Sequence, residues 1–147
     1  MKQKDHYRQV IRLVSGIGRL TNPQHLPALS DRGVSLSQFL VLDALSAATG
    51  ALRMGELARQ AGLTSTELSR VVSSLEDDAA VARRKDPEDS RGRLVALTAA
   101  GRRLHRTVER EATRDLRGVW EDFTHEEWHR FIDYLGRLED GLQRVRG

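Results

Sequence analysis

The stretch MGELARQAGLTSTELSRVVSSL, residues 54–75, predicts two short helices joined by a tight turn. Gly62 separates them, at a position where a left-handed C-cap favours glycine. Thr64 and Glu67 have the spacing of a capping box, which marks the start of the second helix. Apolar residues at helical spacing predict the two buried faces: Leu57, Ala58 and Ala61 in the first helix, and Leu68, Val71, Val72 and Leu75 in the second.

The outward face of the second predicted helix is short, polar and nearly free of acid. Hydroxyl side chains reach phosphates and base edges without repelling them, so such a face suits a DNA groove. The same pattern fits an ordinary αα-hairpin with a polar surface, and this stretch alone leaves both interpretations open. The face consists of Ser65, Thr66, Ser69, Arg70 and Ser73, with Glu67 as its single acid.

Upstream, the sequence predicts an amphipathic helix, a loop and a buried helix. Residues 5–20 place apolar side chains on one face of the first helix. Residues 21–33 contain two prolines and predict a loop, in which His25 is expected to face solvent. Ser35 and Gln38 form a second capping box. The helix that follows is apolar on more than one side, which predicts a place in the middle of the domain.

Downstream, the sequence predicts a β-hairpin. Residues 81–86 and 93–98 have the pattern of strands, and residues 87–93 between them contain the Pro, Asp, Ser and Gly of a hairpin loop. Helix, turn, helix and hairpin follow one another in the order of a winged helix-turn-helix. This order favours the DNA-binding interpretation. Four basic residues cluster at the hairpin: Arg83, Arg84, Lys85 and Arg93.

The C-terminal part predicts two helices that pack along their length. Thr98 is the expected N-cap of a charge-rich helix that extends to about residue 120. In the last helix, apolar residues alternate three and four apart, which is the pattern of a coiled-coil seam. The first helix could supply part of its partner, but a second subunit explains the seam better. The predicted dimer interface includes Tyr7, Val10, Ile11, Val14, Phe131, Leu135, Leu138 and Leu142.

Composition bounds the class of protein. The 147 residues are 39% hydrophobic and 31% charged, which is enough for one domain with a core, or for a smaller domain with dimerisation helices. A net charge of +3 and a pI near 9.8 permit nucleic-acid binding without requiring it. Without cysteine there is no disulfide or thiolate site. Lacking a long apolar run or a secretory signal, the chain is expected to be cytoplasmic, with no membrane partner.

Over about residues 5–145 the chain resembles the MarR family of bacterial transcription regulators. The matching stretches are LSQFLVLDAL (36–45), GELARQAGLTSTELSRVVSSLE (55–76) and, above all, RRKDPEDSRGRLVALTAAGRRL (83–104). The last is similar to the family's wing pattern, in which D-P-x-D-x-R precedes an apolar strand and L-T-x-x-G. The residues that carry this pattern are Asp86, Pro87, Asp89, Arg91, Leu97, Thr98 and Gly101.

The resemblance implies a mainly α chain, residues 1–147, with a small β-hairpin wing. Residues 34–98 would form the winged helix-turn-helix, flanked by dimerisation helices in residues 5–33 and 99–147. The second helix of the motif would enter the major groove, and Arg91, oriented by Asp89, the minor groove, where a narrow groove attracts arginine. The DNA-binding set is Thr64, Ser65, Thr66, Ser69, Arg70, Ser73, Arg84, Asp89, Arg91 and Arg93.

The resemblance also implies partners. A homodimer would bind a pseudo-palindromic operator whose half-sites lie about one helical turn apart. Relatives often respond to small aromatic acids or phenols bound between the dimer helices and the winged region, which implies a repressor relieved by such an effector. Tyr7, His25 and Trp120 are candidate lining residues, although aromatic residues on apolar faces more often belong to a core.

Three positions depart from the family's pattern. Residues 78–80, Asp-Ala-Ala, replace the usual glycine before the first strand, so the helix there would extend or the chain would bend differently. Ser74 stands where an arginine is frequent, which removes one phosphate contact. Arg53 occupies the place of a Ser or Thr that caps the first helix of the motif, which predicts a weaker cap.

Residues 125–129 spell H-E-x-x-H, the signature of zinc peptidases. Thr124 and Glu127 form a capping box that makes the first of these histidines the first helical residue, where the helix dipole opposes a cation. The seam also turns this helix toward a packing partner. We therefore predict no catalytic residue, cofactor or resident metal. Weak metal binding by the histidine pair, joined by His105 or His6, is the alternative.

Two other functions compete with specific DNA binding. A winged-helix adaptor for another protein would keep the fold, but it would not need Arg91 beside Asp89 or the basic cluster at the hairpin. A sequence-indifferent DNA-coating protein would rely on phosphate neutralisation, which a net charge of only +3 disfavours.

Overall fold

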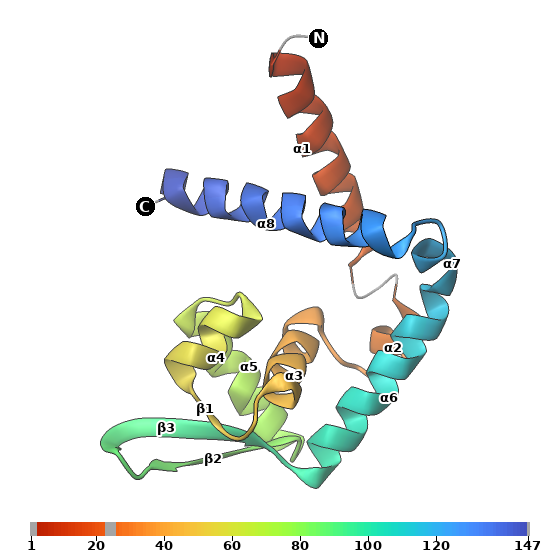
Figure 1. Cartoon of the computed structure of the whole chain (residues 1–147). Coiled ribbons are helices and arrows are strands. Elements are labelled where there is room, and N and C mark those ends of the chain that lie inside the picture. The colour runs from red at the N-terminus through yellow and green to blue at the C-terminus, as the bar shows by residue number, and fades with distance from the viewer. Residues whose placement is uncertain (1–2, 23–25, 147) are drawn as a thin grey trace. The chain divides into compact units, whose positions relative to one another are not determined.

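The computed structural model describes residues 3–22 and 26–146, and the elements follow one another as labelled in Figure 1. The chain divides into two compact units, residues 1–112 and 113–147, which are described separately. His25, which the sequence predicts to face solvent, lies outside the described residues. The elements are α1 (Gln3–Leu20), α2 (Pro27–Ser30), α3 (Leu36–Ala47), β1 (Leu52–Arg53), α4 (Met54–Ala61), α5 (Ser65–Asp77), β2 (Val81–Asp86), β3 (Asp89–Leu97), α6 (Ala99–Asp115), α7 (Arg117–Trp120) and α8 (His125–Arg146).

Helix α3 lies at the centre of the first unit, as its sequence predicts. Its capping box is formed: Gln38 N donates to Ser35 Oγ at 3.1 Å, and Ser35 N donates to Gln38 Oε1 at 2.9 Å. Helices α4 and α5 and the sheet pack around it in one apolar cluster. The buried residues of α3 are Val41, Leu42, Ala44 and Leu45.

The turn between α4 and α5 confirms the helix-turn-helix geometry. Gly62 has a φ of +68°, which is the left-handed conformation expected of a glycine C-cap. Thr64 N donates to Glu67 Oε2 at 2.8 Å, and Glu67 N donates to Thr64 Oγ1 at 3.2 Å, so the capping box fixes the start of α5. The faces turned inward are Leu57, Ala58 and Ala61 on α4, and Leu68, Val72 and Leu75 on α5.

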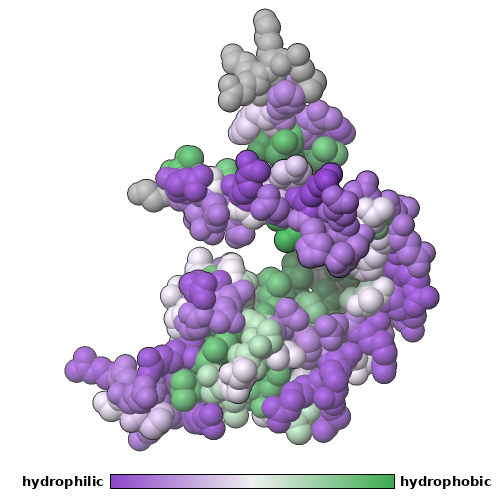
Figure 2. All heavy atoms as spheres, viewed as in Figure 1, coloured by the Kyte–Doolittle hydropathy of each residue, from purple (hydrophilic) through white to green (hydrophobic). Residues whose placement is uncertain are grey.

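The sheet is antiparallel, with the strand order β1-β3-β2. One strand here was not predicted, and one expectation is wrong. The pair Leu52–Arg53 forms an edge strand that its length of two residues hid from the sequence pattern. The predicted loop of residues 87–93 is also shorter, because β3 already begins at Asp89 and the register shifts beyond Lys85 in an irregularity of the ladder. Figure 2 shows apolar surface where the end of α3 meets this sheet.

The connection from α5 to β2 bends as a glycine would allow, although it contains none. Helix α5 ends at Asp77, and Ala79 takes a left-handed φ of +57°, which is costly for a residue with a side chain. Thr98 holds this turn by donating from Oγ1 to Ala79 O at 2.6 Å and from N to Ala80 O at 3.1 Å. A Cβ on Gly101 would lie 1.9 Å from Ala80 O, so this close approach requires glycine.

Two helix boundaries differ from expectation. Within the predicted loop of residues 21–33, Pro27 starts the short α2, because proline is preset for the first turn and Leu29 is buried. The helix after Thr98 ends at Asp115 instead of about residue 120. Leu116 leaves the helical conformation, with φ −93° and ψ 5°, and becomes the N-cap of α7.

The second unit centres on aromatic contacts at the start of α8. Trp128 Nε1 donates to Trp120 O at 3.1 Å, and its ring lies 4.8 Å from that of Trp120 and 5.0 Å from that of Phe123. Thr124 and Glu127 form the predicted capping box, and α8 begins at His125 as expected. None of the described residues of α8 is buried, and Trp128 itself is half-buried.

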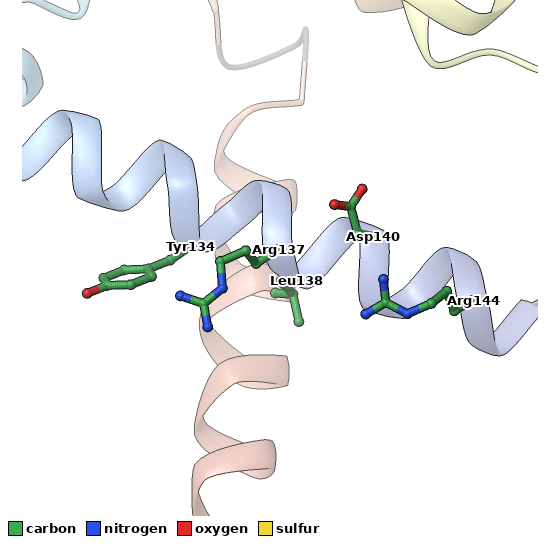
Figure 3. A pocket seen from close by; sticks show the side chains of 5 residues that line it. All are labelled: Tyr134, Arg137, Leu138, Asp140 and Arg144. Atoms are coloured by element: carbon green, nitrogen blue, oxygen red, sulfur yellow. The ribbon is translucent and has the colours of Figure 1, made fainter.

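Helices α1 and α8 each expose an apolar face. On α1 the exposed side chains include Tyr7, Ile11, Val14 and Ile17. The hollow in Figure 3 is lined by α8 alone, with the Arg137 guanidinium 5.8 Å from the centre of the Tyr134 ring, so it is a groove along one helix. Throughout residues 3–22 and 26–146, no helix combines the length and apolarity that crossing a membrane demands.

Candidate nucleic-acid interface

Helix α5 presents the predicted polar face to solvent. Leu68, Val72 and Leu75 anchor the opposite side in the core, so the rotation of the helix about its own axis is fixed. The capping glutamate is occupied by the backbone N–H and hydroxyl of Thr64, which hold the pKa of Glu67 below its ordinary value. The exposed residues of this face are Thr64, Ser65, Thr66, Ser69, Arg70 and Ser73.

Arg83 connects this face to the sheet. From β2 its Nη2 donates to Ser73 Oγ at 2.8 Å, and its Nε lies 3.8 Å from Glu76 Oε1. The Ser73 hydroxyl therefore already accepts one hydrogen bond, and its own proton remains available to an external acceptor. The sequence placed Arg83 only within the basic cluster of the hairpin. Strand alternation was the available signal, since Arg83 pairs with the buried Val95 and so faces the core side.

The side chain of Ser74 is engaged in a hydrogen bond within the fold. Gln38 Nε2 donates to Ser74 Oγ at 3.0 Å and so links α3 to α5. At the position where the MarR-like pattern often has arginine, this chain therefore has a serine engaged within the fold. The side chain of Ser74 therefore braces α5 against α3.

Arg91 lies within strand β3, whereas the sequence predicted it in the hairpin loop. Arg91 lies in the irregular segment of β3, and its backbone N donates to Asp89 Oδ1 at 3.0 Å. Asp89 thus contacts the backbone of Arg91 and shapes the turn, whereas orientation of the guanidinium was expected. Arg93 donates from Nη1 to Gly92 O at 3.0 Å, and Arg84 lies opposite Leu94. All three arginines are exposed.

Arg53 ties the wing to the helix-turn-helix. Its Nε donates to Asp86 Oδ2 at 2.6 Å, and its Nη2 donates to Glu88 Oε2 at 3.0 Å. Asp86 is only 5% exposed, and it also accepts from Glu88 N at 2.9 Å. The Glu88 backbone N–H and the Arg53 guanidinium lower the pKa of Asp86. Arg53 makes no side-chain cap on α4, as expected, and clamps the wing instead.

The steric fit at the wing end supports this clamp. A Cβ on Gly92 would lie 3.2 Å from Asp86 Cβ and 3.4 Å from Asp89 Cβ. Such a contact is tight, so glycine lets the first part of β3 lie close to the buried carboxylate. Sequence reasoning missed the clamp because Arg53 and Asp86 are 33 residues apart and neither belongs to a periodic pattern.

The histidines of α6 and α8 each make local contacts within their own unit. His125 Nε2 and His129 Nε2 are 2.9 Å apart on the exposed first turns of α8. His105 belongs to another setting, where its Nε2 lies 2.9 Å from Asp43 Oδ1 and its ring stacks on Phe39 at 5.6 Å. It therefore links α6 to α3, and the HExxH pair remains a surface feature of α8.

Comparisons with known proteins agree with this arrangement. Residues 32–92 match a model of the MarR family. A helix-turn-helix-type transcriptional repressor from Mycobacterium tuberculosis is 37% identical over 97 residues, which cover 66% of this chain and 69% of that protein. The chain belongs to the MarR family. The transcriptional activatory protein BadR of Rhodopseudomonas palustris is 31% identical over 121 residues, covering 80% of this chain and 69% of BadR.

Solved structures share the fold of this MarR-family chain. AbsC, a MarR regulator from Streptomyces coelicolor, has a TM-score of 0.82 at 22% identity, covering 97% of each chain. A mutant MarR from E. coli complexed with operator DNA has a TM-score of 0.77 at 22% identity, covering 94% of this chain and 99% of that one. NadR in complex with 4-hydroxyphenylacetate has a TM-score of 0.73 at 25% identity, covering 87% and 89%.

Proposed function

We propose that this chain is a homodimeric, sequence-specific regulator that binds duplex DNA and represses transcription. The observation that carries the proposal is the exposed face of α5, hydroxyl-rich and basic, joined by Arg83 to a wing with three exposed arginines. The 37% identity to a named transcriptional repressor favours repression, whereas the resemblance to BadR makes activation the competing outcome.

The two parts of this surface would read different grooves. Helix α5 would enter the major groove, where Ser65, Ser69 and Arg70 reach base edges or phosphates. Arg91 would insert into the adjacent minor groove, whose negative potential favours a guanidinium. The clamp of Arg53 on Asp86 supports this division, because it holds the wing in one position relative to α4.

Dimerisation would use the apolar faces of α1 and α8. A monomer that leaves Phe131, Leu135, Leu138 and Leu142 exposed along one helix has a seam suited to a second helix. Two winged regions related by a two-fold axis would read a pseudo-palindromic operator with half-sites about one helical turn apart.

We further propose that a small aromatic or phenolic effector relieves repression. NadR, which has a similar fold, was crystallised with 4-hydroxyphenylacetate. Tyr7 and Trp120 are the described aromatic residues among the candidate lining positions, and both are exposed. Such an effector would bind the DNA-free protein more tightly than the DNA-bound protein. The ratio of these two affinities sets how far it lowers operator affinity.

Selection of bound duplexes from a random pool, followed by anisotropy titration of the enriched sequence, tests the proposal. We expect a two-fold symmetric motif bound far more tightly than scrambled duplex, with an affinity that falls as salt rises. Failure to enrich any motif, together with capture of a protein partner through the same surface, would favour the adaptor. Binding of duplexes from the pool with no motif enriched, and with no protein partner, would indicate a DNA-coating protein.

A further inference from the structure

Three potential metal ligands come together where α6 packs on α3 in the first unit. Asp43 of α3, and His105 and Glu109 of α6, each offer one ligand atom, and these three atoms lie within 4.8 Å of one another. The sequence pointed to His105 only as a companion of the histidine pair on α8, whereas the structure brings it together with two carboxylates. In residues 3–22 and 26–146, this is the one group of three such side chains close enough to share a metal ion.

The imidazole of His105 is held in a fixed orientation by its surroundings. Its side chain is only 4% exposed, and its ring stacks on Phe39 at 5.6 Å with 11° between the planes. The fully buried Val108 packs with Phe39 and Leu104, which anchors this part of α6 against α3. The Nε2 atom consequently lies 2.9 Å from Asp43 Oδ1. A ligand that is already oriented loses little conformational freedom when it binds a metal.

The two carboxylates lie at the open edge of the cluster. The Asp43 side chain is 55% exposed, and Glu109 is exposed as well. Glu109 follows His105 by four residues, so the two side chains lie one turn apart on the same face of α6. Within the described part of the chain, neither carboxylate has an arginine or lysine within ion-pair distance. The cluster therefore carries negative charge that a divalent cation from solvent could reach and neutralise.

We propose that Asp43, His105 and Glu109 bind one divalent transition-metal ion, with Zn²⁺ as the best match. Imidazole nitrogen and carboxylate oxygen are both zinc ligands, and three protein ligands leave a fourth position for water. Ca²⁺ and Mg²⁺ prefer sites made of oxygen alone, so the imidazole disfavours them. Zinc bonds of about 2.0–2.2 Å place two ligand atoms at most about 4.4 Å apart, so the exposed carboxylates need to close in only slightly. The bound ion would join α6 to the central helix α3.

Isothermal titration of the metal-free, full-length protein with Zn²⁺ tests the site. No DNA and no organic acid is present, so the outcome is independent of the proposed function and of its effector. The titration is made on the wild type and on the double variant His125→Ala, His129→Ala, which lacks the exposed histidine pair of α8. In both we expect one Zn²⁺ per chain at this site, bound at least about tenfold more tightly than Mg²⁺. Zn²⁺ should also raise the midpoint of thermal unfolding, because the three ligands meet only in the folded chain.

Substitutions of the two exposed carboxylates separate a metal site from a structural hydrogen bond. Glu109→Gln should weaken Zn²⁺ binding at least about tenfold, since even residues that only support a metal ligand contribute that much. Asp43→Asn keeps an acceptor for His105 but removes one charge, and it should weaken Zn²⁺ binding by a similar factor. Because both side chains are exposed, circular dichroism should show that both variants remain folded.

Glu111→Gln is the matched control. It removes the same charge from α6 and breaks the ion pair with Arg32, yet Glu111 is outside the cluster, so Zn²⁺ affinity should stay unchanged. Zn²⁺ affinity that survives both Glu109→Gln and Asp43→Asn would place the ion elsewhere and overturn the proposal. Binding that is lost in the double histidine variant would assign the ion to α8, and the absence of Zn²⁺ binding by the folded wild type would leave Asp43 and His105 as a structural pair; either result would also overturn it.

Discussion

Helices α5 and α8 begin in the same way and end with opposite surfaces. Each starts with a threonine and glutamate capping box, Thr64 with Glu67 and Thr124 with Glu127. Helix α5 then buries its apolar face and exposes a polar one. In α8 the apolar face itself is exposed, with Phe131 at 43%, Leu135 at 43% and Leu138 at 38%.

The difference shows that an amphipathic pattern predicts a helix but not what its apolar face packs against. Around α5, the helices α3 and α4 and the sheet are close in the chain and cover the apolar face. In α8, the first turn packs on the segment before it through Trp128, and none of the described residues of the helix is buried. The exposed side of α5 is therefore suited to a polar ligand, and the exposed side of α8 to an apolar protein surface.

The largest expected effect comes from placing charge on the α8 seam. The double variant Leu135→Asp, Leu138→Asp should abolish the dimer at micromolar concentration, because two carboxylates cannot be buried in an apolar interface without partners. Light scattering should show the monomer mass. Gln143→Asp, which adds charge outside the seam, is the control and should remain dimeric. A double variant that still dimerises would mean that α8 packs within its own chain.

The next effect should come from removing the same side chain from the two helices. Leu68→Ala, on the buried side of α5, should lower the free energy of unfolding by about 2–5 kcal/mol, the cost of a core cavity. Leu138→Ala should leave the winged region folded and chiefly weaken the dimer. Urea unfolding at several protein concentrations distinguishes the two variants. Only for Leu138→Ala should the loss of stability depend on protein concentration. Equal, concentration-independent losses would remove the distinction between α5 and α8.

The features of this fold that could be predicted depend on residues close in sequence. The three capping boxes and the glycine turn at Gly62 rest on spacings of three or four residues, and the structure has each helix start where the boxes place it. The helix break at Leu116 was missed, since the apolar spacing continues through it while the backbone does not.

The contacts that could not be predicted join distant segments. Arg53 and Asp86 are separated by 33 residues, His105 and Asp43 by 62, and Arg32 and Glu111 by 79. None of these pairs leaves a periodic signal, because each depends on how the folded elements meet. For the candidate interface, the sequence therefore identified the exposed polar residues, whereas the hydrogen-bond partners of Arg83 and Arg53 required the structure.

Arg91→Ala tests whether the polar side of the first unit is the DNA-binding surface. We expect specific operator affinity to fall by about 1–3 kcal/mol, in line with the loss of one groove contact. Arg137→Ala removes an exposed charge from α8 and should change operator affinity little. Anisotropy titration against the selected operator measures both variants. Equal losses in the two would indicate a general charge effect rather than a wing contact.

Arg53→Met tests the clamp that positions the wing. It should cost about 1 kcal/mol of folding stability, because a hydrogen bond to a mostly buried carboxylate is lost. It should also weaken operator binding, provided that Arg91 is present. In the Arg91→Ala background we expect no further loss, since Arg53 acts by holding the wing. Additive losses in this double-mutant cycle would mean that Arg53 contacts DNA itself.

The smallest effect compares the two capping boxes through their pH dependence. Contacts with Thr64 and Thr124 lower the pKa values of Glu67 and Glu127 below the ordinary range. Each carboxylate therefore stabilises the fold fully above the ordinary glutamate pKa, and this stabilisation is lost as pH falls toward the folded value. Glu67→Gln and Glu127→Gln should flatten the acid limb of the stability curve, because glutamine keeps the box without titrating. With thermal unfolding followed across acid pH, Glu67→Gln should act on the winged region and Glu127→Gln on the dimer. If the two variants change the same thermal unfolding transition, α8 folds together with the winged region. The proposed difference between α5 and α8 would then be wrong.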